Sequence, residues 1–203
     1  MRRIRLEDLL ASEAERLSLS ETLRAGGLAA IPTETFYGLA VDPRSGTGVG
    51  RALATKQRGE EKPLLVLCAD REQLVELGVS ASAEALDRFF AIWPAPLTVV
   101  FPLAAPVSAS LGASTLAVRV PAHAGVRALL RVVGPVTATS MNRSGERPCE
   151  TADDVERQFA GEIDVLVDGG PSPGGLPTTL VDASVNPPRL LRKGAFDWPQ
   201  ARG

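Results

Sequence analysis

The sequence predicts an α/β fold built on a mixed β-sheet with flanking helices. Short apolar runs of strand length alternate with amphipathic segments of helical period along most of the chain. Residues 115–120 alternate strictly, so Leu116 and Val118 would face one side and Thr115 and Arg119 the other. Several short strand candidates follow one another late in the chain, which favours a mixed sheet over a purely parallel one.

The first third of the chain predicts two helices, each followed by a buried strand. Ser12 and Glu15 have the spacing of a capping box, and Gly26 with Gly27 would end the helix that they begin. The elements expected next are a strand at 28–31, a helix at 47–56 and a strand at 64–68.

Caps and periodicity mark the remaining elements. Ser82 is placed to cap a helix whose Leu86, Phe89 and Phe90 share one face, and Thr151 is placed to cap a later helix. The other expected elements are strands at 97–101, 136–139, 165–167, 179–181 and 189–191, and helices at 127–133 and 151–159.

Length and composition indicate one ordinary globular domain spanning residues 1–203. Hydrophobic residues make up 44% and charged residues 23% of the chain, which excludes a disordered or fibrous class. The net charge of -2 gives no bulk attraction to nucleic acid or anionic membranes, so any RNA contact must be local.

Targeting segments and common cofactor motifs are not expected. The basic residues at 1–5 are followed by acidic ones rather than by an apolar run, and the longest apolar runs are far shorter than a membrane span. We therefore expect a cytoplasmic protein with no membrane contact. Cys68, Cys149 and His123 do not have the spacing of a zinc site, and His123 is interpreted as a surface residue. The glycines at 46–50 do not complete a dinucleotide loop, and the chain has no Walker A motif.

Two pairs of polar residues predict an anion clamp. Lys56 and Arg58 follow an expected helix, and Ser140 and Asn142 follow an expected strand. Together they supply a point charge, a guanidinium fork and neutral hydrogen-bonding groups, which suit a polyphosphate. The alternatives are a solvated helix end for the cations and a simple turn for the serine and asparagine.

Other polar positions have two interpretations each. Arg119 is a guanidinium inside a valine-rich strand, so it needs either a carboxylate partner or an anionic ligand. Residues 32–39 leave an expected strand with several hydroxyls and an acid, which suits either ligand orientation or turn formation. The loop at 169–177, rich in glycine and proline, is either a mobile cover or a connection.

Six short motifs occur in one order along the chain: IPTETFYGL (31–39), KQR (56–58), WPAPLT (93–98), AVRVP (117–121), TSMNRSG (139–145) and TTLVD (178–182). Together they resemble the YrdC/TsaC family of threonylcarbamoyl-AMP synthases, and the resemblance covers residues 17–194. The resemblance implies a YrdC-like fold, with an open, twisted α/β sheet and a positively lined concave surface.

The resemblance also implies a nucleotidyltransferase. Such an enzyme makes threonylcarbamoyl-AMP and pyrophosphate from L-threonine, bicarbonate and ATP, with Mg²⁺ held through the ATP phosphates and no metal ligand from protein side chains. A downstream threonylcarbamoyl-transferase complex then uses the adenylate to form threonylcarbamoyladenosine in tRNA. Weak contact with tRNA is also expected.

Matching the family motifs assigns roles to particular positions of this chain. The catalytic residues implied are Lys56 and Arg58. The ATP-binding residues implied are Lys56, Arg58, Thr115, Ser140, Asn142 and Arg192. The threonine-binding residues implied are Thr33, Arg119, Ala138 and Thr178. The chain departs from the family pattern at Gly59, Met141 and Leu67, and some members have a histidine where this chain has Leu67.

Two other functions fit parts of the sequence. A similar domain performs carbamoyl transfer in hydrogenase maturation, within much longer proteins that carry zinc-binding segments, but this chain has only two cysteines. A non-catalytic binder of structured RNA could use the same concave surface. The acidic net charge and the aromatic content of 4% argue against that binder.

Overall fold

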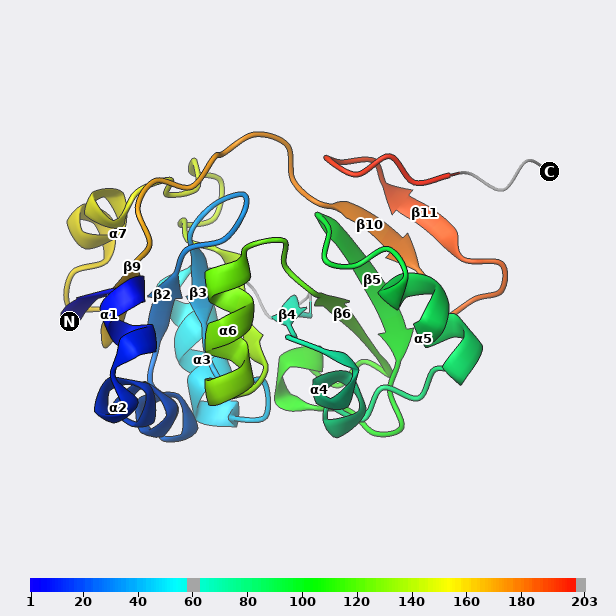
Figure 1. Cartoon of the computed structure of the whole chain (residues 1–203), viewed down its shortest axis with the longest axis horizontal. Helices are drawn as coiled ribbons and strands as arrows, with labels where there is room; N and C mark the ends of the chain where they lie inside the picture. The colour runs from blue at the N-terminus through cyan, green and yellow to red at the C-terminus, as the bar shows by residue number, and fades with distance from the viewer. Residues whose placement is uncertain (58–62, 200–203) are drawn as a thin grey trace.

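Two mixed β-sheets form the frame of the molecule (Figure 1). The computed structural model describes residues 1–57 and 63–199. Among these residues the first sheet has the strand order β1-β9-β2-β3-β8, and the second has the order β11-β10-β5-β6-β4-β7. The strands of the first sheet are β1 (Arg2–Arg5), β2 (Ala29–Ile31), β3 (Gly38–Ala40), β8 (Thr139–Ser140) and β9 (Val165–Asp168). Those of the second are β4 (Val66–Leu67), β5 (Leu97–Pro102), β6 (Thr115–Arg119), β7 (Val136–Thr137), β10 (Thr179–Asp182) and β11 (Arg189–Arg192).

One short stretch of chain joins the two sheets. Strand β7 pairs with β4 in the second sheet, and β8 pairs with β3 in the first. Ala138 is the single residue between β7 and β8, and its backbone N–H donates to the Leu65 carbonyl at 2.9 Å. The Thr137 hydroxyl donates to the Leu39 carbonyl at 3.1 Å, which ties the joint to β3 as well. The two sheets are therefore joined directly by the backbone at Ala138.

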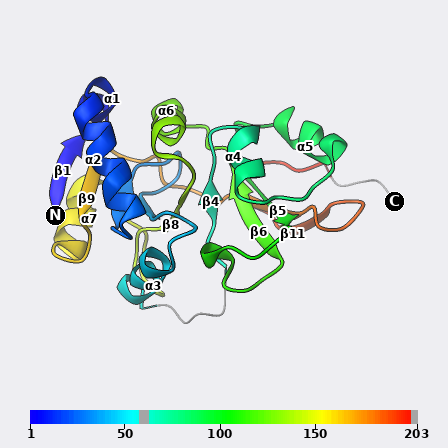
Figure 2. The same cartoon turned by 90° about the horizontal axis from the view of Figure 1, so that it is seen from below.

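Helices cover both faces of the first sheet and one face of the second. The helical segments are α1 (Leu6–Ala11), α2 (Glu13–Arg24), α3 (Gly46–Thr55), α4 (Arg71–Glu76), α5 (Ala83–Phe90), the 3-10 turn η1 (Ser108–Ser110), α6 (Ala124–Val133) and α7 (Ala152–Phe159). Seen from below, α1, α2 and α6 lie on one side of the first sheet, and α3 and α7 lie on the other (Figure 2). The buried residues form two clusters that match this division, one under α1, α2 and α6 and a larger one under the other helices.

The second sheet is apolar on the face that carries α5. Phe89 of α5 meets Phe101 of β5 edge to face at 5.3 Å between ring centroids, and Trp93 closes the cluster. Because side chains alternate along a strand, Thr98 and Arg119 lie on the opposite face.

Most of the predicted elements are confirmed. The alternation in β6 is confirmed, since Leu116 and Val118 are fully buried in the core. The caps are confirmed at Ser12, Ser82 and Thr151, whose side chains accept hydrogen bonds from backbone N–H groups three residues later. The fold class is confirmed as α/β with mixed sheets.

Several elements were not predicted or have different ends. Elements β1, α1, β3 and α4 were not predicted, and the expected strand 136–139 is divided between the two sheets. His123, interpreted as a surface residue without a role, accepts a hydrogen bond from the Val126 N–H at 3.3 Å and caps α6. No helix among the described residues is both long and apolar enough to cross a bilayer.

Candidate functional site

A cleft of about 470 Å³ lies between the two sheets. Its first wall comes from the loop between β2 and β3 and from β8, and its second wall from β5, β6, β10 and β11. The residues that line it are Thr33, Thr35, Phe36, Tyr37, Gly38, Pro63, Leu65, Thr98, Ala117, Arg119, Ala138, Thr139, Ser140, Pro148, Pro177, Thr178, Leu180 and Arg192. The four positions assigned to threonine, Thr33, Arg119, Ala138 and Thr178, therefore lie around one cavity. What they bind stays a prediction.

Arg119 is the most deeply buried cation of this cleft. Only 3% of its side chain is exposed, and its Nη1 lies 3.1 Å from Oε1 of Glu34. Burial lowers the pKa of Arg119, and the negative charge of Glu34 opposes that shift. The structure therefore supplies the carboxylate partner that the strand position requires.

The ion pair is not fully satisfied. Arg119 Nε and both carboxylate oxygens of Glu34 are buried without a hydrogen-bond partner among the described residues. A buried polar atom left unpaired typically costs ~1–3 kcal/mol, so native proteins rarely keep several together without a reason. Arg119 thus has the carboxylate partner considered from the sequence, and its unbonded Nε leaves capacity for a ligand.

Thr33 shapes its own loop. Its hydroxyl donates to the Phe36 carbonyl at 2.7 Å and accepts from the N–H groups of Thr35 and Phe36 at 3.2 and 3.3 Å. This is the turn-forming use of threonine that the sequence left open. Thr33 lines the cleft, but its hydroxyl is already engaged by the backbone.

The loop at 169–177 crosses from the first sheet to the second along the upper edge of the molecule (Figure 1). It is tied to the first wall by hydrogen bonds from Ser172 N–H to the Glu150 carbonyl at 2.7 Å and from Gly174 N–H to the Thr35 carbonyl at 2.8 Å. Tyr37 donates its hydroxyl to the Gly170 carbonyl at 2.8 Å, and burial raises the pKa of Tyr37 to about 12. In this structure the loop is a strap that closes one side of the cleft.

Two hydroxyls and a guanidinium meet at the second wall. Thr98 and Thr178 share a hydrogen bond at 2.8 Å between their hydroxyl oxygens, and Arg192 Nη2 donates to the Thr178 carbonyl at 3.0 Å. Arg192, assigned to ATP, therefore lies beside Thr178, assigned to threonine.

Lys56, Ser140 and Asn142 come together at the end of α3. Lys56 follows the last residue of α3, and its ammonium donates to the Ser140 carbonyl and to the carbonyl and Oδ1 of Asn142, the last two at 3.0 and 3.1 Å. The Ser140 hydroxyl donates to Asn142 Oδ1 at 2.6 Å. These residues stand 84 and 86 positions from Lys56, so the convergence expected of the clamp is found for these three members. Their role in binding a nucleotide stays a prediction.

Five other positions named from the sequence lie away from the cleft lining or outside the described residues. Thr115 shares a strand face with Arg119 but stands at the other end of β6, and it is not among the residues that line the cleft. Arg58 and Gly59 lie outside the described residues. Leu67 is fully buried opposite Arg119 in the pairing of β4 with β6, and Met141 is also fully buried.

Sequence reasoning missed Glu34 and Thr98 as site residues. Glu34 was noted only as an acid within the stretch 32–39, and nothing in the sequence pairs it with a residue of β6. A signal did exist, because an arginine in an apolar strand requires a counter-charge, and a carboxylate next to a strand exit is one place to look for it.

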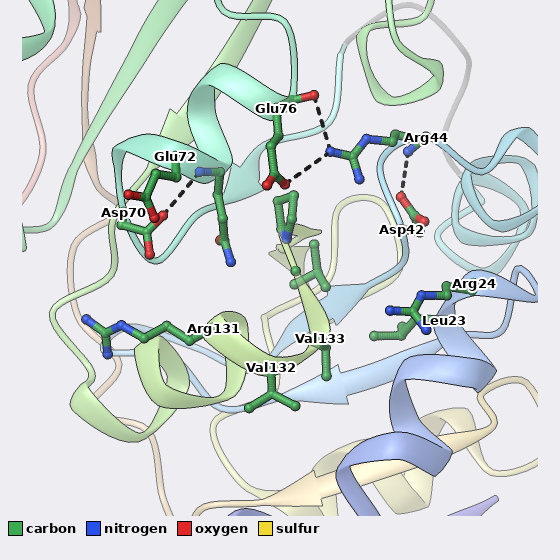
Figure 3. A pocket seen from close by; sticks show the side chains of 14 residues that line it. Leu23, Arg24, Asp42, Arg44, Asp70, Glu72, Glu76, Arg131, Val132 and Val133 are labelled. Carbon is green, nitrogen blue, oxygen red and sulfur yellow. Dashed lines mark hydrogen bonds and ion pairs between the residues drawn. The ribbon is translucent and has the colours of Figure 1, made fainter.

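A second hollow of about 500 Å³ lies near the start of β7, among the ends of α2, α4 and α6 (Figure 3). Some of its charged residues are engaged within the lining itself, and Arg44 forms an ion pair with Glu76 at 3.8 Å. Arg44 Nη2 donates to the Glu76 carbonyl at 3.3 Å, and the Arg44 N–H donates to Asp42 Oδ1 at 2.9 Å. Asp70 accepts from Gln73 N–H at 3.1 Å as the cap of α4. None of the assigned residues lines this hollow, so the cleft between the sheets is the better candidate.

Within residues 1–57 and 63–199, no group of three or more histidine, cysteine, aspartate or glutamate side chains could hold a metal ion. Both cysteines are buried and free. Burial raises the pKa of the Cys149 thiol to about 11, so it stays protonated at neutral pH. Neither metal ligation by clustered side chains nor a thiolate nucleophile is indicated in this part of the chain.

Comparison with known proteins agrees with this fold. The family Sua5/YciO/YrdC, described as telomere recombination, matches residues 21–194. A threonylcarbamoyl-AMP synthase of Idiomarina loihiensis is 39% identical over 162 residues, which is 77% of this chain and 87% of that protein.

Similar solved structures support the same fold. P. abyssi Sua5 complexed with L-threonine has a TM-score of 0.82 and 33% identity and covers 95% of this chain, which spans 56% of the length of that protein. E. coli YciO has a TM-score of 0.78 with 92% of each chain covered, but its 22% identity supports the fold alone. The fold and a family match over most of its length show that the chain belongs to the Sua5/YciO/YrdC family.

Proposed function

We propose that this protein is a threonylcarbamoyl-AMP synthase, a nucleotidyltransferase that joins L-threonine, bicarbonate and ATP with release of pyrophosphate. The observation that carries the proposal is the cleft itself, where a buried guanidinium and the Thr98–Thr178 pair lie opposite Ser140, which in turn is bonded to Lys56. The relative from Idiomarina loihiensis carries that name, and the P. abyssi protein holds L-threonine.

The chemistry needs positioning more than a protein nucleophile. The amine of threonine captures carbon dioxide or bicarbonate, and one oxygen of the resulting carbamate attacks the α-phosphorus of ATP as pyrophosphate leaves. Groups that orient both substrates and neutralise the negative charge can supply most of the rate enhancement of such a step. The polar residues of the cleft are of these kinds.

We assign the residues around the cleft to the two substrates. Arg119 takes the carboxylate of threonine, while Thr178 and the backbone at Ala138 form the rest of the amino-acid pocket, with Thr33 shaping the loop beside it. The phosphates of ATP are bound by Lys56, Ser140 and Asn142, with Arg58 and Arg192. Thr115 is also assigned to ATP, although it stands at the other end of β6 from Arg119. Lys56 performs this role through the loop that it holds, since its ammonium donates to oxygens of Ser140 and Asn142.

Mg²⁺ fits this arrangement as a companion of ATP. The described residues offer no acidic cluster for it, and Mg²⁺ commonly binds through substrate phosphates and water rather than through an all-protein cage. When bound, it would neutralise phosphate charge. The chain is proposed to work as one domain in the cytoplasm and to pass its adenylate to a threonylcarbamoyl-transferase complex acting on tRNA.

Pyrophosphate release from ATP tests the proposal. We expect release that requires both L-threonine and bicarbonate, with threonylcarbamoyl-AMP found by mass spectrometry. Omitting either small substrate is the matched control. ATP turnover that ignores threonine would contradict the proposed activity. Salt-dependent tRNA binding without any turnover would favour the RNA-binding alternative.

A further inference from the structure

We propose that Glu34 is a positioning residue for amino-acid recognition: it holds the guanidinium of Arg119 at the cleft wall, where that group meets the substrate carboxylate. This inference rests on the proposed function, because it takes Arg119 as the group that binds threonine. Glu34 itself is not among the residues that line the cleft, so it acts through Arg119 rather than on the substrate.

The first support is the contact and its burial. The two charged atoms lie 3.1 Å apart, with 3% of the Arg119 side chain and 14% of the Glu34 side chain exposed. Glu34 is the one carboxylate that pairs with Arg119 among the described residues. An isolated buried charge is far more costly than a paired one, so without Glu34 the guanidinium would be driven toward water and out of its present position.

The second support is the hydrogen-bonding capacity that the pair leaves unused. Arg119 Nε and Glu34 Oε2 are buried without a hydrogen-bond partner in the described part of the chain, and Glu34 Oε1 has only its ion-pair contact with Arg119 Nη1. A pair that served only to stabilise the fold would be expected to satisfy these atoms. An incompletely satisfied pair at a cavity wall is instead typical of a site that a ligand completes.

The third support is where the loop of Glu34 is attached. Thr33 and Thr35 flank Glu34, and both line the cleft. The loop is held by the Thr33 hydroxyl and by the strap, through Gly174 N–H to the Thr35 carbonyl at 2.8 Å. The backbone on both sides of Glu34 is therefore fixed, so its carboxylate is presented to Arg119 on the opposite sheet from an anchored loop.

Steady-state kinetics of Glu34→Gln test the proposal, since glutamine keeps the shape and removes the charge. We expect the KM for L-threonine to rise about 10- to 100-fold while the KM for ATP stays within about twofold, because misplacing a recognition group by about 1 Å can cost that much. A role confined to charge balance predicts the opposite, since an uncompensated Arg119 would attract the threonine carboxylate more strongly. An unchanged or lower KM for threonine in folded Glu34→Gln therefore overturns the proposal.

A double-mutant cycle with Arg119→Met shows whether Glu34 acts through Arg119. In the Arg119→Met background, Glu34→Gln is expected to change threonine binding by less than about twofold. If Glu34 instead contacts the substrate ammonium, its substitution will weaken threonine binding in both backgrounds. It will then spare 3-hydroxybutyrate, which has the carboxylate and hydroxyl but no amine. Either of those results overturns the positioning role.

Two further measurements cover a Glu34→Gln variant that does not fold and separate this proposal from the proposed function. Glu34→Asp retains the charge but withdraws the carboxylate by one methylene group, so we expect a smaller rise in the KM for threonine with little loss of thermal stability. This variant decides the matter if Glu34→Gln does not fold, and a wild-type KM for it would contradict the proposal. Calorimetry of the wild-type chain with L-threonine separates the two levels. Binding without turnover contradicts the proposed function alone, and absence of binding overturns both.

Discussion

Arg3 and Arg119 both lie on strands beside carboxylates, yet their surroundings differ in two respects. Arg3 on β1 donates to Asp168, Asp153 and Glu156 at 2.7 to 3.1 Å, and 37% of its side chain is exposed. Arg119 on β6 has Glu34 as its one carboxylate partner in the described part of the chain, and its side chain is nearly inaccessible. The carboxylates raise the pKa of Arg3, whereas burial lowers that of Arg119.

This difference separates a structural arginine from one that we propose to be functional. Arg3 links β1 to β9 and to α7, and each of its guanidinium nitrogens has a carboxylate acceptor. Arg119 has a buried nitrogen without an acceptor and stands at a cavity wall. The number of satisfied donors, weighed against burial, is thus more informative than the presence of an ion pair.

The largest expected effect is the loss of turnover in Arg119→Met. Removing the guanidinium leaves the substrate carboxylate without its partner, and losing one such charge-stabilising group commonly costs about 100- to 1,000-fold in rate. Threonine-dependent pyrophosphate release measures it. Arg3→Met is the matched control and should keep turnover within about twofold. Equal losses in the two variants would abolish the distinction drawn between the two arginines.

Lys56→Ala extends the comparison to a buried cation that has several oxygen partners. Its ammonium holds the Ser140–Asn142 loop, so we expect turnover to fall by about 100-fold or more while the protein stays folded. Pyrophosphate release and circular dichroism measure the two quantities. Near-normal release would refute the assignment of this loop to ATP.

A smaller effect is expected for Arg119→Lys. Lysine keeps the positive charge but lacks the planar fork, so the KM for threonine should rise about 10-fold with turnover at saturation less affected. Arg3→Lys should leave that KM unchanged. A threonine KM that does not respond to Arg119→Lys would mean that charge alone, and not geometry, is recognised.

The smallest effect concerns stability and its dependence on pH. The ion pairs of Arg3 are exposed, so Arg3→Met should cost about 1 kcal/mol or less in the free energy of unfolding. Removal from water would raise the pKa of Asp168, but the hydrogen bonds from Arg3 and the Gly170 N–H outweigh it and hold that pKa below 3.8.

The sign of the pH effect follows from that lowered pKa. The unfolded chain takes up a proton on Asp168 at a higher pH than the folded chain does. The stabilisation is therefore complete above about pH 4 and is lost as the pH falls through the folded pKa. Urea unfolding between about pH 5 and pH 2 should show a flatter dependence in Arg3→Met than in the wild type. Parallel curves would show that Arg3 does not lower the pKa of Asp168.

The features that the sequence predicted correctly are those that depend on residues close together in the chain. The caps at Ser82 and Thr151 and the alternation in β6 depend on residues a few positions apart, and all three are confirmed. Strand β1 was missed because its partner β9 comes from the other end of the chain, and its own residues are mostly charged. Helix α4 was missed because six residues give too little periodicity, although Asp70 caps it.

Some features of the candidate site could also be predicted from the sequence, and others could not. Motif resemblance pointed to Arg119, Thr178 and Ser140, and all three line the cleft. It could not give the Glu34–Arg119 contact, because that pair joins residues far apart in the chain and depends on how the two sheets face each other. Nor could periodicity show that the hydroxyl of Thr33 is used within its own turn.

The joint at Ala138 has a consequence for how the two substrates affect each other. Ser140 lies on one wall, and the strand that carries Arg119 lies on the other. They are connected by the covalent link from β8 to β7 and by the hydrogen-bonded pairings of β7 with β4 and of β4 with β6. A twist of this peptide would shift the phosphate side and the amino-acid side in concert. If the joint twists on binding, occupancy of one half changes the affinity of the other, and thermodynamic reciprocity then requires the two changes to be equal.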